Sequence, residues 1–185
     1  MNELLKNPSV DQMQKYFTLY QKRIYPLIAQ VCIQPMDGMH GLNTHTAAVV
    51  FRGIDFALSL QQDPWPVIFA CAFHDMARTH DEDDTEHGKN AVPMAKQIME
   101  KFNLDEQTRQ SIIFAVENHT IGKTAPDKIS ACLWDADRVR VSQVCRYAPE
   151  YYNTTRGRMV ASSDYKNYLK FQRQCFPNLS WDKIY

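Results

Sequence analysis

The chain has 185 residues, of which 44% are hydrophobic and 23% are charged. This length and composition are typical of a soluble domain with its own core, so we expect residues 1–185 to form a single domain. The 21 basic and 21 acidic side chains give a formal net charge of zero, which offers no electrostatic reason to expect a nucleic-acid partner. No apolar run is long enough to cross a bilayer, so no membrane partner is expected either.

Cysteine usage and the first residues point to a cytoplasmic protein. The cysteines are Cys32, Cys71, Cys132, Cys145 and Cys175. An odd, scattered set without a Cys-x-x-Cys pair is typical of reduced thiols in the cytosol, not of a disulfide framework. Residues 1–6 also lack the basic-then-apolar order of a secretory signal.

The N-terminal third predicts two helical stretches separated by a loop. Ser9 can cap a first helix that runs to about residue 33, and Pro26 should kink this helix or divide it in two. After a loop over residues 35–42, a second helix is expected to begin at Asn43 or Thr44 and to end near residue 60.

The most apolar segment covers residues 65–77. By periodicity alone it could be a buried strand or a buried helix. Its length, its alanines and the preceding Asp63-Pro64, which suits a helix start, favour the helix. Near its end stand His74 and Asp75, two polar side chains that are costly to bury without partners.

The rest of the chain predicts further helices. An acidic loop over residues 81–86 precedes a helix that reaches about residue 102. That helix begins either near Glu86, with a kink at Pro93, or after His87, with Asn90 as its cap. Later helices are expected over about residues 105–119, 129–144 and 164–175, with irregular structure over residues 151–159. Because no segment alternates with the period of a strand, the predicted fold class is all-α.

Helical phase places further imidazoles and carboxylates where they can meet His74 and Asp75. His119 ends its helix on the inward, apolar face, although it could instead bind last-turn carbonyls. The other candidates are His45, His87, Asp135 and Asp137. Imidazole and carboxylate ligands from separate helices suit Mn, Fe, Co, Ni or Zn, and the lack of thiolate candidates argues against a closed structural zinc site.

The ordered set of His45, His74-Asp75 and Asp137 resembles the HD-domain superfamily of metal-dependent phosphohydrolases. The resemblance covers about residues 40–140, with helical additions before and after this core. It implies a compact helical fold with the metal site between helices.

The resemblance also implies one or two divalent transition metals per chain. The first metal would be held by four residues: His45, His74, Asp75 and Asp137. Asp135 is the alternative to Asp137 as the last ligand. A second metal would be held by a bridging Asp75 with His87 and His119.

The implied activity is hydrolysis of a phosphomonoester or phosphodiester in a nucleotide or related small phosphorylated metabolite. A metal-activated water would attack, with His74 and Asp75 as the catalytic pair. Side chains near the site would bind the substrate phosphate. The candidates are Arg52, Arg78, Lys89, Arg138 and His40. Residues after about 145 lie outside the resemblance and are expected to line the pocket or to form the surface of a homodimer.

Two other functions fit the same residues. Some HD-domain proteins with four histidines and two aspartates hold a di-iron centre and catalyse an oxygen-dependent cleavage. Others bind a metal or a nucleotide without catalysis and serve a regulatory function. Hydrolysis is the commoner use of the fold, and we rank it first on this analogy.

Overall fold

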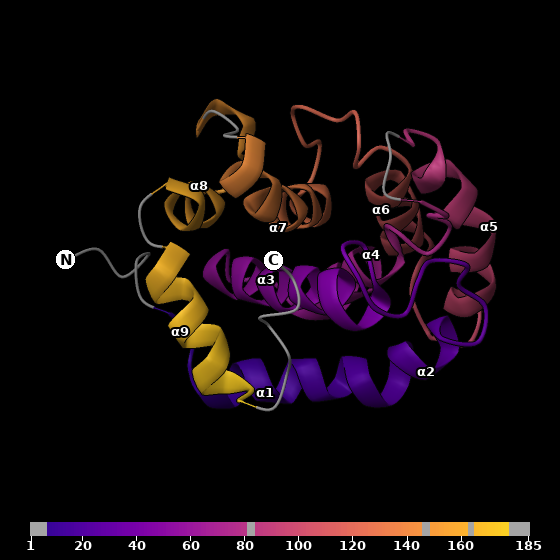
Figure 1. Cartoon of the computed structure of the whole chain (residues 1–185). Helices are drawn as coiled ribbons and strands as arrows, with labels where there is room; N and C mark the ends of the chain where they lie inside the picture. The colour runs from indigo at the N-terminus through magenta and orange to yellow at the C-terminus, as the bar shows by residue number, and fades with distance from the viewer. Residues whose placement is uncertain (1–6, 81–83, 146–148, 163–164, 178–185) are drawn as a thin grey trace.

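The structure is a computed structural model that describes residues 7–80, 84–145, 149–162 and 165–177 (Figure 1). Every regular element within these ranges is a helix, which confirms the predicted all-α class. None of the helices in the described ranges is long and apolar enough to span a membrane. Residues 1–6, on which the expectation about a secretory signal rested, and residues 81–83 of the acidic loop lie outside the described ranges.

The N-terminal helical stretch consists of α1 (Val10–Leu19), the π-helical η2 (Tyr20–Ile24) and α2 (Tyr25–Ile28). Ser9 caps α1 as predicted, because its side chain accepts a hydrogen bond from the Gln12 N–H. The change of helix type just before Pro26 is the interruption expected there, since proline has no N–H to continue an α-helical ladder. The stretch ends five residues earlier than predicted, and the N–H groups of residues 33 and 34 instead donate to the Met76 carbonyl.

Two buried helices form the centre of the molecule. The π-helical η3 (Leu42–Thr46) leads into α3 (Ala47–Ser59), and α4 (Pro64–Phe73) packs against α3. Asp63 caps α4 by accepting a hydrogen bond from the Trp65 N–H at 3.0 Å. Residues 67–73 are all fully buried, which confirms the helix favoured for this apolar run. The helix ends at Phe73, earlier than predicted, because the chain turns at His74 and Asp75.

The close contact of α3 with α4 depends on Gly53. A Cβ atom added there would overlap the Cys71 Sγ and lie 3.2 Å from a Val67 methyl. We therefore expect Gly53→Ala to lower the free energy of unfolding by about 1–3 kcal/mol, as overpacked cores do. Urea denaturation followed by circular dichroism measures this change. Unaltered stability would show that the two helices can separate without cost.

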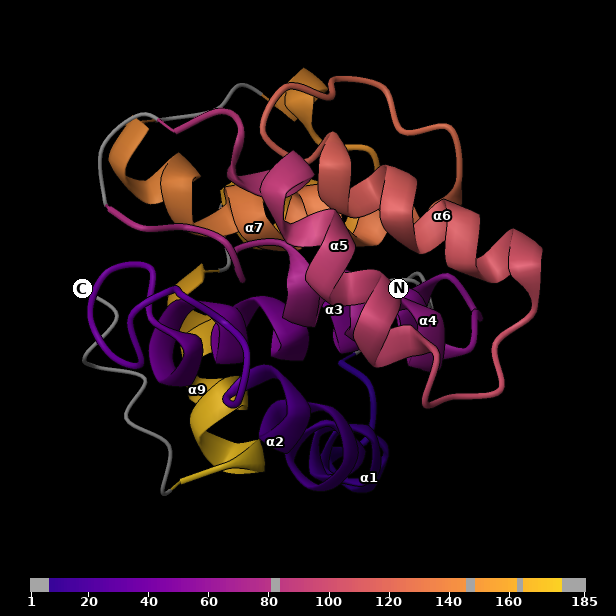
Figure 2. The ribbon, with the colours of Figure 1, turned by 90° about the vertical axis from the view of Figure 1, so that its right-hand side faces the viewer.

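Helices α6 (Glu106–Glu117) and α7 (Lys128–Cys145) pack against α4, and α5 (His87–Met99) packs against α6 (Figure 2). Of the two predicted starts for α5, the one near Glu86 is correct, and Pro93 lies inside the helix. Asn90 is not the cap. The Asp84 carboxylate instead accepts hydrogen bonds from the N–H groups of Glu86 and His87, both at 3.1 Å.

The C-terminal part contains the short 3₁₀ turn η4 (Pro149–Tyr151), α8 (Thr155–Ser162) and α9 (Tyr165–Cys175). The expectation of irregular structure over residues 151–159 is wrong from Thr155 onward. The reason is a buried ion pair, in which the Arg156 Nε donates to both oxygens of Asp55 on α3 at 3.0 and 3.2 Å. Figure 1 shows α9 crossing beside α1, where the Phe17 and Phe176 rings lie 4.6 Å apart.

Candidate metal centre

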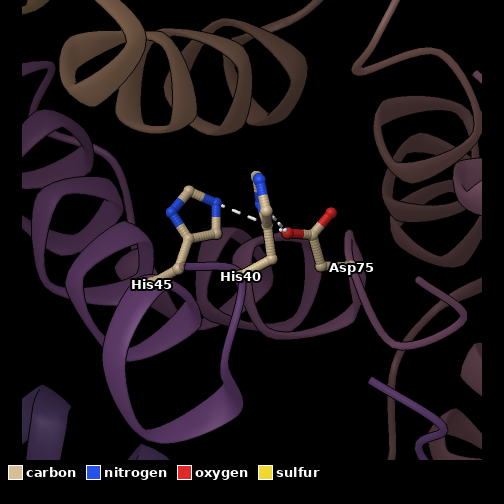
Figure 3. Close-up of side chains that lie close together, drawn as sticks. All are labelled: His40, His45 and Asp75. Carbon is tan, nitrogen blue, oxygen red and sulfur yellow. Dashed lines mark ion pairs between the residues drawn. The ribbon is translucent and has the colours of Figure 1, made fainter. Parts of the chain in front are cut away.

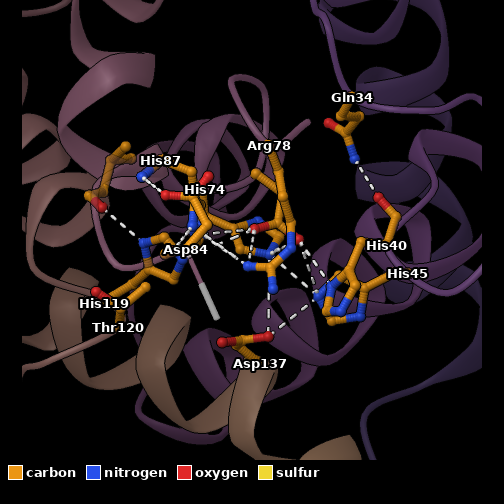
Figure 4. A network of polar contacts seen from close by, with 12 residues as sticks. Gln34, His40, His45, His74, Arg78, Asp84, His87, His119, Thr120 and Asp137 are labelled. Carbon is orange, nitrogen blue, oxygen red and sulfur yellow. Dashed lines mark hydrogen bonds and ion pairs between the residues drawn. The ribbon is translucent and has the colours of Figure 1, made fainter. Parts of the chain in front are cut away.

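The predicted ligands lie together in one cluster, although they come from several different elements (Figure 4). His74 and Asp75 form the turn after α4, His45 lies in η3, and His87 begins α5. His119 follows α6, and Asp137 lies in the middle of α7. All of them are buried except Asp137, whose side chain is 20% exposed. The helices thus bring together every residue of the predicted ligand set.

Backbone carbonyls fix the orientation of three imidazole rings. His74 donates its Nδ1–H to the Cys71 carbonyl at 2.8 Å, and His119 donates its Nδ1–H to the Val116 carbonyl at 2.7 Å. The His87 Nδ1 contacts the Asp84 carbonyl in the same way. Because a carbonyl can only accept, each Nδ1 carries the hydrogen, which leaves Nε2 as the nitrogen that can present a lone pair to a metal. Such carbonyl partners are typical of metal-binding histidines.

The two oxygens of Asp75 face two different groups of histidines. Oδ1 lies 2.9 Å from the His87 Nε2 and 3.8 Å from the His119 Nε2. Oδ2 lies 3.3 Å from the His74 Nε2 and 3.4 Å from the His45 Nε2. This division is the arrangement expected of a carboxylate that bridges two metal ions.

The group around Oδ2 includes Asp137. The Asp137 Oδ1 lies 3.1 Å from the His45 Nε2 and 3.9 Å from the His74 Nε2. Asp135, the alternative last ligand, is fully buried elsewhere and accepts hydrogen bonds from the backbone N–H groups of Asn153 and Thr154. Of the two aspartates, the structure therefore brings only Asp137 to the cluster.

The surroundings hold three of these side chains in the protonation state that metal binding requires. Burial alone would raise the pKa of Asp75, but the adjacent His74 and the other rings hold it well below its usual range. Burial alone would also raise the pKa of Asp137, but the adjacent His45 lowers it below its usual value. Burial lowers the pKa of His45 to about 4. At neutral pH both carboxylates are therefore charged and His45 is neutral.

The donors fit a divalent cation. The Nε2 atoms of His87 and His119 lie only 2.8 Å apart, although the backbone contacts leave a lone pair on each. Neither buried oxygen of Asp75 receives a hydrogen bond of normal geometry. Burial should lower the pKa of His74, yet the attraction of Asp75 raises it, so the cluster favours positive charge. Each of two trios, His45–His74–Asp137 and Asp75–His87–His119, has its donor atoms within 4.8 Å of one another.

Two of the predicted substrate-binding residues lie at this cluster. The Arg78 Nη1 lies 3.2 Å from the His87 Nδ1 and 3.9 Å from the Asp75 Oδ1. The His40 Nδ1 lies 3.5 Å from the Asp75 Oδ2, and Figure 3 shows His40 and His45 on the same side of this carboxylate. The side chains of Arg78 and His40 are 12% and 19% exposed, so with Asp137 they form the solvent-facing side of the site.

The other three predicted substrate-binding residues point elsewhere. The Arg52 Nε donates to the Ala136 carbonyl at 2.5 Å inside the core. Arg138 donates to backbone carbonyls, including that of Tyr151 at 3.1 Å. The exposed Lys89 pairs with Glu86 at 3.1 Å. For these three residues, a position in the sequence close to a predicted ligand did not indicate where the side chain would find its partner.

Two supporting residues were missed in the sequence. The buried Gln34 donates from its Nε2 to the His40 carbonyl at 2.8 Å and to the Thr46 Oγ1 at 2.9 Å, and thereby holds the loop that carries His40. Nothing in the sequence distinguishes Gln34 from other glutamines. Asp84 fixes both the start of α5 and the His87 ring. Its position three residues before His87 is a capping signal that could have identified it.

Comparison with known proteins agrees with this geometry. A family model of the HD domain matches residues 43–148, which include all six predicted ligands. The chain belongs to the HD-domain family. The HD fold also matches the crystal structure of a predicted HD superfamily hydrolase from an uncultured Thermotogales bacterium, with a TM-score of 0.62. The two chains are 21% identical, and the match covers 84% of this chain and 90% of the other. No curated protein matches this HD domain.

Proposed function

We propose that this HD domain is a metal-dependent phosphohydrolase that cleaves a phosphomonoester or phosphodiester of a nucleotide or related small phosphorylated metabolite. The observation that supports it best is the division of the Asp75 oxygens between two groups of Nε2 atoms. The similar Thermotogales protein, described as a predicted hydrolase, agrees with this function.

The roles of the side chains follow from their positions. A bound divalent metal would polarise a phosphoryl oxygen and lower the pKa of a coordinated water. His74 and Asp75 lie at the centre of the site, and the hydrogen bond from the His74 Nδ1 to the Cys71 carbonyl fixes the orientation of its ring. Asp137, His40 and Arg78 lie on the solvent-facing side, where a substrate would enter. Imidazole and carboxylate ligands suit Mn, Fe, Co, Ni or Zn.

Arg78 is the cation best placed to bind the substrate phosphate. A charge-assisted hydrogen bond contributes about 1.5–3 kcal/mol, so we expect Arg78→Met to raise KM about 10- to 100-fold. Steady-state kinetics with the preferred phosphoester measures this effect. Lys89→Met is the matched control, because Lys89 pairs with Glu86 on the surface and should leave KM unchanged. If the two substitutions change KM equally, Arg78 does not bind the substrate phosphate.

A screen of phosphomonoesters and phosphodiesters, combined with metal analysis of the purified protein, tests the proposed function. We expect phosphate release that depends on added metal and proceeds under anaerobic conditions. No release across the panel with the metal-loaded protein would contradict hydrolysis.

A di-iron oxygenase is the second candidate. The observation that favours it is that two of the donor groups, His45–His74–Asp137 and Asp75–His87–His119, together hold four imidazoles and two carboxylates. Two irons per chain with oxygen consumption that depends on an organic substrate would support this function. Metal-stimulated phosphate release without oxygen would support the hydrolase instead.

A further inference from the structure

The segment that follows the HD match contacts the part of α7 that carries Asp137. The match ends at residue 148. Just beyond it, the N–H groups of Asn153 and Thr154 donate to the two oxygens of Asp135, at 2.8 and 2.6 Å. The Asn153 side chain adds a third hydrogen bond to Asp135 at 3.3 Å. A fully buried carboxylate two residues before a predicted metal ligand is therefore held by this segment.

The neighbours of Asp137 on either side are held as well. The Arg138 Nη1 donates to the Tyr151 carbonyl at 3.1 Å, and the Tyr152 hydroxyl donates to the Arg138 carbonyl at 3.2 Å. The Ala136 carbonyl accepts the hydrogen bond from Arg52. Each residue next to Asp137 is thus fixed from outside α7, whereas the Asp137 side chain faces the histidines.

Helix geometry explains how hydrogen bonds to Asp135 can orient Asp137. Residues two positions apart point in directions about 200° apart around an α-helix. Asp135 and Asp137 therefore lie on nearly opposite sides of α7, and hydrogen bonds at Asp135 set the rotation that aims Asp137 at His45. The approach is close, because a Cβ atom on Gly157 would lie 2.6 Å from the Asp135 Oδ2.

We propose that residues 151–154 form a brace that positions Asp137 for metal binding, with Asp135 as the positioning residue. The proposal rests on the metal centre proposed above. It gives the segment beyond the HD match a function, namely control of the affinity of the site for metal.

The test compares Asp135→Asn with Asp55→Asn. Both carboxylates are fully buried, and Asp55 accepts hydrogen bonds from Arg156 on α8. We expect both substitutions to lower the melting temperature. Only Asp135→Asn should weaken Mn²⁺ binding, by about 10- to 100-fold in a calorimetric titration, as loss of supporting hydrogen bonds does at other metal sites. Gly157→Ala, which presses on Asp135 without removing a hydrogen bond, should weaken Mn²⁺ binding in the same direction.

A second measurement separates failure of the brace from failure of the metal centre. The His45 Nε2 lies 3.1 Å from the Asp137 Oδ1, so nitrogen NMR of the histidine rings reports the position of Asp137 without added metal. Asp135→Asn should shift the His45 signal and Asp55→Asn should not. The brace is wrong if the two variants give the same Mn²⁺ affinity and the same His45 signal. If the wild-type protein binds no Mn²⁺ but Asp135→Asn still shifts the His45 signal, the metal centre alone is contradicted.

Discussion

Asp75→Ala is expected to abolish both metal binding and phosphoester hydrolysis. Asp75 is the only residue whose oxygens face both groups of histidines among the described residues, so its loss affects both metal positions. Loss of the several kcal/mol that a metal contributes to transition-state stabilisation corresponds to a decrease in kcat/KM of at least about 1,000-fold. Elemental analysis and turnover of the purified variant measure the two effects together.

Asp63→Ala is the control for Asp75→Ala. Asp63 is a carboxylate that caps α4 at its other end, through the Trp65 N–H. Its loss should cost about 1 kcal/mol of stability but leave metal content and turnover unchanged. Circular dichroism must show that both variants keep their helices. Full activity in a folded Asp75→Ala protein would contradict the proposed metal centre.

His119→Ala is expected to reduce the metal content from two ions per chain to one. The variant loses one of the two imidazoles that face the Asp75 Oδ1. The donors around Oδ2 remain in place, because His45, His74 and Asp137 come from other elements. Metal titration and elemental analysis measure the stoichiometry.

His80→Ala serves as the matched control for His119→Ala. His80 is exposed and follows the His74-Asp75 turn, so its loss should leave two ions bound. A single ion in wild-type protein that His119→Ala does not affect would show that His87 and His119 are structural or substrate-binding residues. Loss of both ions would show that the two positions depend on each other.

Much of the fold could be predicted because it depends on local patterns. Periodicity alone does not distinguish a strand from a helix over residues 65–77. The preceding Asp63-Pro64, which suits a helix start, correctly favours the helix. Helix α8 was not predicted, because the partner that buries Arg156 is Asp55, 101 positions away in the sequence. An interaction over that distance leaves no local signal.

The ligands were easier to predict than the residues around them. His74 and Asp75 directly follow a buried apolar run, and His119 lies on an inward face, so burial alone required polar partners. Arg52 and Arg138 were expected to bind substrate because of their distance from His45 and Asp137 along the chain. Both instead donate to backbone carbonyls, which every residue offers and which no sequence pattern distinguishes.

Anomalous diffraction from a crystal soaked in Mn²⁺ tests the central claim most directly, because it locates metal ions independently of activity. We expect two peaks, one on each side of the Asp75 carboxylate, with His45, His74 and Asp137 around the first and His87 and His119 around the second. The absence of any peak among these six side chains, or a peak without contact to Asp75, would contradict the claim.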